Sequence, residues 1–292
     1  MPASHPIKDK IKALKIEYDS LKIGKDSLLT LIQEAEIPEM VYNSNAIENS
    51  TLTLKETEKI LLEMEVSRDV SLREVFEAKN LARVIEYIRT KSQEEEITLK
   101  TILLLHQMLL GNIDDSIAGR FRKMGEYVRV GTHIATAPEH VERMMDNFLL
   151  EYTSEHDMYF SDKIAKFHLN FEVLHPFNDG NGRIGRIIIN YQLQRLGYPG
   201  IIIRDKEKNE YYKGFQEYTD KRNTKIMEKT IYLSLLESLH KRIAYLKGYT
   251  MIPVIEYAKR IEKLAPTVLN AARRQTIPAF REKGVWKIGV NK

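Results

Sequence analysis

The sequence predicts a mainly α-helical protein with one small β-hairpin inside it and a compact, basic C-terminal module. Apolar residues recur at helical spacing over most of the chain, for example over residues 99–110. Helix-capping patterns precede several of these segments, such as Thr53 followed three residues later by Glu56. The alternation typical of strands is confined to short stretches around residues 127–135 and 277–288.

The expected helices follow one another with short connections. Pro38 should end the first of them, because a proline inside a helix removes a backbone hydrogen bond and clashes with the preceding turn. A charged run at 91–96 is expected to be an exposed connection, and residues 111–124 are expected to be irregular. In chain order, helices are expected over residues 7–35, 41–49, 53–65, 71–90, 99–110, 138–153, 161–174, 183–196, 209–222 and 227–247.

The composition is that of a soluble globular protein, with 43% apolar and 29% charged residues among 292. There is no cysteine, which excludes disulfides, thiolate metal sites and a cysteine nucleophile. No apolar run approaches the ~20 residues of a membrane span, and the N-terminus lacks the apolar run of a signal peptide. We therefore expect a cytoplasmic protein with no membrane partner. We divide the chain into an N-terminal helical region 1–95, a central catalytic region 96–247 and a C-terminal module 250–292.

The segment 175–186 reads HPFNDGNGRIGR and has the features of a phosphate-binding site. Its Gly180, Asn181 and Gly182 lie between two helical segments, where glycines let successive N–H groups converge on one anion. The helix that follows adds the N–H groups and the positive dipole end of its first turn. The backbone of this turn is therefore a candidate anion hole.

Charged side chains around the turn supply the other parts of a phosphoryl-transfer site. Arg183 and Arg186 are three residues apart, so they share a helix face and can hold two phosphates. Asp179 offers the hard oxygen ligand that Mg²⁺ prefers beside phosphate oxygens. His175 can take a proton from an attacking hydroxyl as a neutral imidazole. A helix–turn–helix corner with incidental polar residues is the alternative, but the joint presence of all these groups favours an active site.

Residues 175–186 resemble the Fic family signature HPFx(D/E)GNGRxxR at every fixed position. The resemblance implies an all-α core with a β-hairpin flap, which corresponds here to residues 127–135. It implies transfer of AMP from ATP, with Mg²⁺, to a Ser, Thr or Tyr hydroxyl of a target protein. The base, the metal ligand and the anion hole would be the groups just described, the two arginines would hold the β- and γ-phosphates, and Phe177 would be buried beneath the loop.

Three residues beyond the motif lie where relatives in that family contact the nucleotide, namely Tyr211, Tyr212 and Asn223. For the two tyrosines, packing between helices is an equally good interpretation. The stretch 119–122, Gly-Arg-Phe-Arg, resembles the segment that enters the flap in this family.

The segment 44–49 reads SNAIEN and resembles the inhibitory motif (S/T)xxxE(G/N) of the same family. Ser44 and Glu48 are one turn apart on a helix and share a face. In the family this glutamate pairs with the second arginine of the signature, here Arg186, and takes it from the γ-phosphate. Because the motif precedes the core, it indicates the subclass with an N-terminal inhibitory helix. The same glutamate could orient a water for removal of AMP from a modified target.

The C-terminal module has its own pattern. Two short helices, at 253–263 and 267–275 with Thr267 as a cap, precede a hairpin formed by 277–281 and 285–288. This arrangement resembles the winged helix-turn-helix of excisionase and MerR-type DNA-binding modules. Lys-Leu-Ala at 263–265 replaces the glycine that is usual at the turn between the helices.

The module is also basic. Residues 250–292 contain nine Lys or Arg and three Glu, a net charge of +6 that leaves −2 of the chain's +4 for the rest. Arg273 and Arg274 suit a DNA groove and its phosphates. A protein-binding or dimerising wing without DNA is an equal alternative.

The sequence therefore predicts an autoinhibited protein adenylyltransferase that modifies a target protein or itself. The alternatives are de-AMPylation by the same site, and a DNA-binding regulator whose core senses nucleotide. Candidate partners are a protein with a hydroxyl side chain, a second copy of the chain, since relatives often dimerise, and DNA at residues 250–292.

Overall fold

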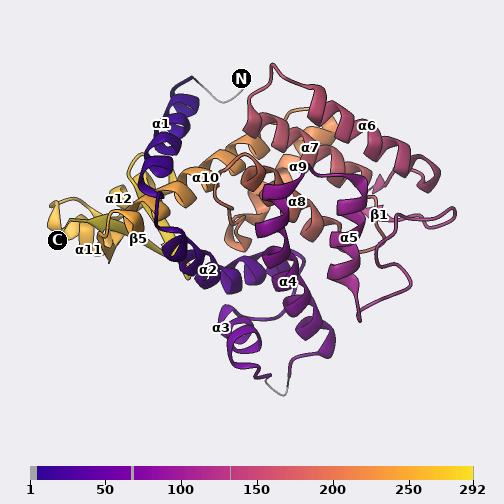
Figure 1. Ribbon diagram of the computed structural model, residues 1–292, viewed down its shortest axis with the longest axis horizontal. Coiled ribbons are helices and arrows are strands. Elements are labelled where there is room, and N and C mark those ends of the chain that lie inside the picture. Colours follow the sequence, from indigo (N-terminus) through magenta and orange to yellow (C-terminus); the bar gives the residue numbers. More distant parts are fainter. Residues whose placement is uncertain (1–4, 67–68, 132, 292) are drawn as a thin grey trace.

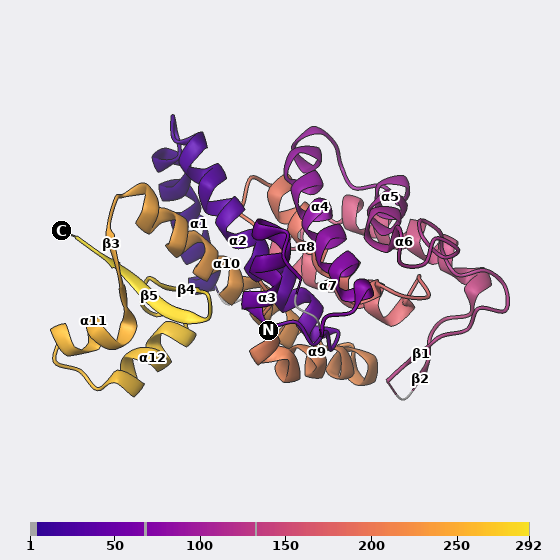
Figure 2. The ribbon, with the colours of Figure 1, turned by 90° about the horizontal axis from the view of Figure 1, so that it is seen from below.

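The computed structural model describes residues 5–66, 69–131 and 133–291, and it confirms the mainly helical prediction (Figure 1). The helices lie in one globule, with the C-terminal module at one end and the β1–β2 hairpin toward the other (Figure 2). The α-helices are α1 (His5–Leu21), α2 (Asp26–Ile47), α3 (Leu54–Glu58), α4 (Leu72–Glu94), α5 (Leu99–Leu110), α6 (Val141–Ser154), α7 (Phe160–Leu174), α8 (Asn181–Arg195), α9 (Lys208–Lys221), α10 (Lys225–Leu246), α11 (Val254–Arg260) and α12 (Ala265–Arg273). Shorter helical turns are η1 (Lys59–Glu63), η2 (Pro138–His140) and η3 (Asp205–Glu207).

The N-terminal helices differ from the prediction, which was wrong about where the chain breaks. The break lies at Gly24, whose φ of 71° ends the first helix, and not at Pro38, which lies inside the continuous α2. A proline within a helix costs about 3 kcal/mol. Burial of α2 side chains such as Val41 and Ile47 in the core offsets that cost. The predicted inhibitory segment therefore begins in the last turn of a 22-residue helix, and Glu48 is the C-cap of that helix. The run at 91–94 also belongs to α4 and is not a connection.

The capping box predicted at Thr53 is confirmed, and the next long helix but one also has a side-chain cap. Thr53 and Glu56 form a reciprocal capping box at the start of α3, and Thr98 accepts a hydrogen bond from the third residue of α5. After α3 the chain widens into the π-helical turn η1. No helix of the part described is long and apolar enough to cross a membrane.

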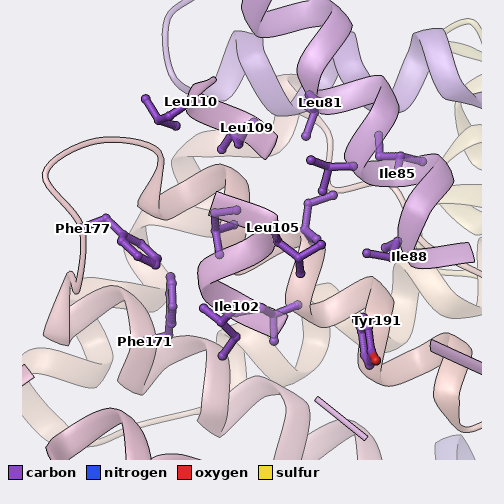
Figure 3. Packing of buried hydrophobic residues seen from close by; sticks show 14 of the residues in the cluster. Leu81, Ile85, Ile88, Ile102, Leu105, Leu109, Leu110, Phe171, Phe177 and Tyr191 are labelled. Atoms are coloured by element: carbon purple, nitrogen blue, oxygen red, sulfur yellow. The ribbon is translucent and has the colours of Figure 1, made fainter. Parts of the chain in front are cut away.

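Two large hydrophobic clusters form the core, and α7 and α8 contribute to both. Ile184 and Ile188 of α8 belong to one cluster, and Ile189 and Leu193 belong to the other. Residues from 1–95 also contribute to both clusters, so the N-terminal helices pack together with the central region. Since α7 and α8 are buried on more than one side, the loop that joins them is held in place by packing (Figure 3).

Two small antiparallel sheets complete the fold. Strands β1 (Arg129–Val130) and β2 (His133–Ile134) form the expected hairpin, whose Thr132 lies outside the described residues. In the C-terminal module, β3 (Thr250–Pro253), β5 (Val285–Val290) and β4 (Ala279–Glu282) are ordered β3-β5-β4. Strand β3 was not anticipated, because four residues carry too little alternation.

The module has a hydrophobic cluster of its own. Its helices and hairpin follow the predicted order, but the predicted cap of its second helix is wrong. Leu264 is the N-cap of α12, and Pro266 lies in the first turn, so Thr267 is already inside the helix. Proline is favoured in a first turn because its missing N–H would have no helical partner there.

Candidate active site

The loop between α7 and α8 owes its shape to two residues in left-handed backbone conformation. His175 ends α7 with φ 52°, and Gly180 precedes α8 with φ 80°. A side chain at Gly180 would be strained at this φ and would meet Leu110 at 3.0 Å. Asn181 closes the loop, because its side chain accepts from the N–H of Phe177 at 2.9 Å and donates to the carbonyl of Phe177 at 2.8 Å. The first turn of α8 is thereby presented at the end of a rigid loop.

Phe177 anchors this loop from below. Its ring is fully buried and stacks on His106 with centroids 3.7 Å apart; Figure 3 shows it directed toward Phe171. His106 accepts from the N–H of Gly119 through Nδ1, so its Nε2 donates to the carbonyl of Asp179, each at 3.0 Å. Burial lowers the pKa of His106 to about 4, which keeps the ring neutral. A neutral histidine of α5 therefore fixes the backbone of Asp179.

The orientation of His175 is suited to proton transfer. Nδ1 lies 3.2 Å from the carbonyl oxygen of Glu172. A carbonyl only accepts, so Nδ1 carries the proton, and in the neutral ring Nε2 then holds the basic lone pair. Arg122 holds the same residue from the flap side, because its guanidinium donates to the carbonyl of His175 at 2.8 Å and to that of Thr136 at 2.7 Å.

Asp179 takes part in a closed ring of four charges. Arg73 contacts Asp179 at 2.5 Å and Glu77 at 3.1 Å, while Arg183 contacts Glu77 at 3.0 Å and Asp179 at 3.1 Å. Burial alone would raise the pKa of Asp179, but Arg183, the backbone N–H of Gly180 and Arg73 hold it below its ordinary value. The carboxylate is therefore ionised at neutral pH.

The donors present at this point fit a magnesium ion. No group of three or more His, Asp or Glu that could hold a metal occurs in the described residues. At such a site Asp179 would supply a carboxylate ligand, and phosphate oxygens and water would complete the coordination, as is common for Mg²⁺ at nucleotide sites. Arg73 would have to withdraw from the carboxylate oxygen that the ion takes.

Arg186 faces the inhibitory segment. Its Nη2 donates to the Glu48 carboxylate and to the Ser44 carbonyl, both at 2.8 Å, and its Nε donates to the Ser44 hydroxyl at 3.0 Å. Burial alone would lower the pKa of Arg186, but the charge of Glu48 raises it. A methyl group at Gly182 would meet a Glu48 oxygen at 2.1 Å. The carboxylate therefore lies directly over the first turn of α8, which the sequence predicts to be the anion hole.

The two tyrosines lie beside Arg186 and α2. The hydroxyl of Tyr211 bonds to Nε2 of His168 at 2.7 Å, and its ring lies 6.0 Å from the Arg186 guanidinium. Tyr212 donates to the carbonyl of Ile47 at 2.8 Å. Asn223 instead lies past the end of α9 and bonds to Glu217 at 3.3 Å. The structure thus brings both tyrosines close to Arg186 and the end of α2, and Asn223 contributes none of the contacts described above.

A buried acid beneath the site went unnoticed in the sequence. Glu172 lies on α7, and burial, reinforced by the charge of Glu48, raises its pKa to about 8. Beside it, burial lowers the pKa of His168 to about 3. Both groups are therefore neutral near pH 7 and add no charge beneath Arg186.

Comparison with known proteins agrees with this geometry. A sequence model of the Fic/DOC family matches residues 96–193. A protein adenylyltransferase Fic of Nematostella vectensis is 33% identical over 222 residues, which are 74% of this chain and 50% of that protein. One of Drosophila yakuba is 35% identical over 175 residues, which are 59% of this chain and 35% of that protein. The chain thus spans half or less of the length of these relatives.

Solved structures resemble the chain over a larger share. A Fic domain containing signaling protein from Bacteroides thetaiotaomicron superposes with a TM-score of 0.74 at 27% identity, covering 82% of this chain and 97% of that one. A Fic family protein from Desulfovibrio desulfuricans covers 100% of this chain and 99% of its own, with a TM-score of 0.66. At 17% identity the second likeness shows the fold alone. The segment that carries the candidate active site therefore lies within residues 96–193, which the Fic/DOC family model matches.

Proposed function

We propose that the protein is an autoinhibited protein adenylyltransferase, which transfers AMP from ATP to a hydroxyl side chain of a target protein or of itself. The observation that carries the proposal is the place of Glu48, whose carboxylate binds Arg186 at 2.8 Å and lies over Gly182. A carboxylate and a phosphate compete for the same two features, a guanidinium and a helix N-terminus. The adenylyltransferase relatives support AMP as the transferred group.

In the proposed reaction the target hydroxyl attacks the α-phosphorus of ATP. His175 takes the hydroxyl proton at Nε2, the new P–O bond forms, and the bond to the bridging oxygen breaks so that pyrophosphate leaves. Arg183 and Arg186 hold the β- and γ-phosphates in line. The backbone N–H groups in the first turn of α8 stabilise the negative charge that develops on the α-phosphate. Mg²⁺ bound at Asp179 would neutralise phosphate charge.

In this proposal the contacts of the two arginines belong to an inhibited state of the site. Arg186 is bonded twice to Ser44 of α2 and once to Glu48, the C-cap of α2, so these groups take up the donors that a γ-phosphate would need. Arg183 is bonded to Glu77 and Asp179. Activation requires that Glu48 leave Arg186, after which the arginine can bind phosphate.

The test is AMP incorporation with ATP labelled at the α-phosphate, read by autoradiography and by mass spectrometry of the intact protein. We expect Glu48→Gly to increase labelling of the protein itself or of added lysate proteins, and His175→Ala in the same background to abolish it. Glu34→Ala is the control, because Glu34 is an exposed glutamate of the same helix and alanine, unlike glycine, preserves the helix. Equal labelling by wild type and Glu48→Gly would remove the inhibitory role, and labelling that survives His175→Ala would remove the base.

A further inference from the structure

The tip of the C-terminal hairpin is docked on the helix that carries the inhibitory glutamate. The backbone N–H groups of Lys283 and Gly284 each donate to the Glu39 carboxylate of α2 at 3.1 Å. The side chain of Lys283 also pairs with Glu58 of α3 at 2.8 Å. Figure 2 shows the β4–β5 hairpin directed from the C-terminal module toward the helices of the core. The tip therefore contacts the chain's own N-terminal region.

Beneath the tip, Glu39 belongs to a series of buried ion pairs that connects α2 through the core to the hairpin. Glu39 pairs with Arg204, Arg204 pairs with Glu237 at 2.8 Å, and Glu237 pairs with Arg281 of β4 at 2.7 Å. All four side chains are at most 10% exposed. Buried charges are tolerated only when they are paired, so removing one partner is strongly unfavourable for the others.

A second set of pairs joins α2 to the same hairpin. Glu36, one turn before Glu39, binds Arg242 at 2.6 Å and Lys241 at 3.0 Å, and Lys241 also contacts Glu282 of β4 at 3.4 Å. Two successive turns of α2 are thus linked to the hairpin: Glu36 through Lys241, which also contacts the hairpin, and Glu39 through backbone N–H groups of the hairpin. This fixes both the rotation and the axial position of the helix.

The docked turns and the inhibitory residues belong to one rigid element. Glu39 lies within α2, and Glu48 is the C-cap of the same helix nine residues later, which corresponds to about 13 Å along the helix axis. Asn43, between them, accepts a hydrogen bond from the N–H of Asp205, next to Arg204. A shift of α2 at Glu39 therefore moves Ser44 and Glu48 relative to Arg186.

We propose that the C-terminal module is a clamp for the inhibitory helix: its hairpin tip holds α2 in the register that places Glu48 on Arg186, and undocking the tip activates the enzyme. The inference rests on the proposed autoinhibition. It gives the module an intramolecular partner, α2, and a role that requires no DNA. Arg281 and Lys283 are positioning residues in this scheme, since they are proposed to act on the site through α2; Arg281 also pairs with Glu207, just before α9, at 2.6 Å.

Two variants undock the tip to different degrees. Arg281→Gln leaves Glu237 with one cation fewer in a buried position, and we expect it to raise AMP labelling about tenfold or more. Lys283→Glu places a second negative charge beside Glu58 on a residue whose side chain is 68% exposed, so the fold should tolerate it. Its effect should be at most about fivefold, the ceiling for an exposed ion pair. The charge swap Lys283→Glu with Glu58→Lys should return labelling to the wild-type level.

The variants are combined with Glu48→Gly to separate the clamp from a general loss of stability. If the clamp acts through the inhibitory contact, Arg281→Gln should add nothing in the Glu48→Gly background. Arg260→Gln is the control, because Arg260 is an exposed residue of the same module that pairs only with Glu256 among the described contacts. Hydrogen exchange of the amides at 41–48 should quicken in Arg281→Gln and in Lys283→Glu, and stay unchanged in the control.

Failure of the clamp and failure of the proposed function give different results. If Glu48→Gly activates the protein while Arg281→Gln and Lys283→Glu label at the wild-type level, the clamp is refuted and autoinhibition stands. If Arg281→Gln raises labelling equally with and without Glu48, its effect does not pass through α2, and the clamp is refuted as well. If Glu48→Gly itself gives no activation, the proposed autoinhibition falls.

Discussion

Glu48→Gln tests how strongly the inhibitory contact restrains the site. The substitution keeps the size of the side chain and removes its charge, while Arg186 keeps its bonds to the hydroxyl and the carbonyl of Ser44. A hydrogen bond to a charged group contributes about 1.5–3 kcal/mol. Since the Glu48 side chain is 37% exposed, solvent screening favours the lower end, about 1.5 kcal/mol. This corresponds to about a tenfold shift of the equilibrium from the inhibited to the free arginine.

The assay is the initial rate of AMP incorporation at saturating ATP, together with thermal unfolding. We expect the rate to rise about tenfold and the Tm to fall by about 4 °C, since a chain of this size loses roughly 2–4 °C per kcal/mol. Ser44→Ala should raise the rate too, and the double variant should be non-additive because both residues bind Arg186. A fall in Tm without a rise in rate would show that the contact stabilises the fold and does not restrain catalysis, which would refute the reasoning.

Three further predictions concern the groups around the loop. Phe177→Ala should lower the free energy of unfolding by about 3–5 kcal/mol, measured by urea denaturation, because it removes a buried ring stacked on His106; a loss below 1 kcal/mol would mean that the loop does not depend on this anchor. The folded pKa of Glu172, about 8, lies above the ordinary 4.5, so the native state binds the proton more tightly and the protein loses stability as pH rises from about 4.5 to about 8. The Tm of Glu172→Gln should therefore rise relative to that of the wild type as the pH increases across that window. Parallel Tm curves of the two proteins would contradict the raised pKa of Glu172. His168 is expected to give the opposite trend in both proteins, so the comparison cancels its effect. Arg73→Ala should tighten the binding of Mn²⁺ to the complex of the protein with ATP, because Arg73, 2.5 Å from an Asp179 oxygen, no longer competes for that oxygen. Electron paramagnetic resonance follows the binding, and an unchanged affinity would show that the arginine does not occupy the metal position.

The grouping of the charged and glycine residues around the central loop was predictable because these residues are contiguous. Glycines, arginines, a carboxylate and an imidazole within residues 175–186 can meet only around one turn, so spacing alone places them together. The capping box at Thr53 was predictable for the same reason, since capping is a local interaction. The roles of these site residues stay predictions until the experiments above are done.

Local patterns failed where tertiary packing outweighed propensity. Pro38 has a strong helix-breaking preference, yet α2 continues through it because both halves of the helix bury apolar side chains. Arg73 and His106 had no signal in the sequence. Arg73 reaches Asp179 across 106 residues of sequence, and His106 reaches it across 73, so only the fold brings them together.

The sequence alone predicts the type of chemistry: a phosphate-binding turn with a base and a metal ligand, and a glutamate at the spacing of an inhibitory motif. Only the tertiary structure decided how these parts are engaged, with Glu48 over Gly182 and the C-terminal hairpin on α2. The physical reason is range. Backbone turns and caps depend on neighbours a few residues away, whereas ion pairs such as Arg186–Glu48, separated by 138 residues, form only after packing has fixed the helices that carry them.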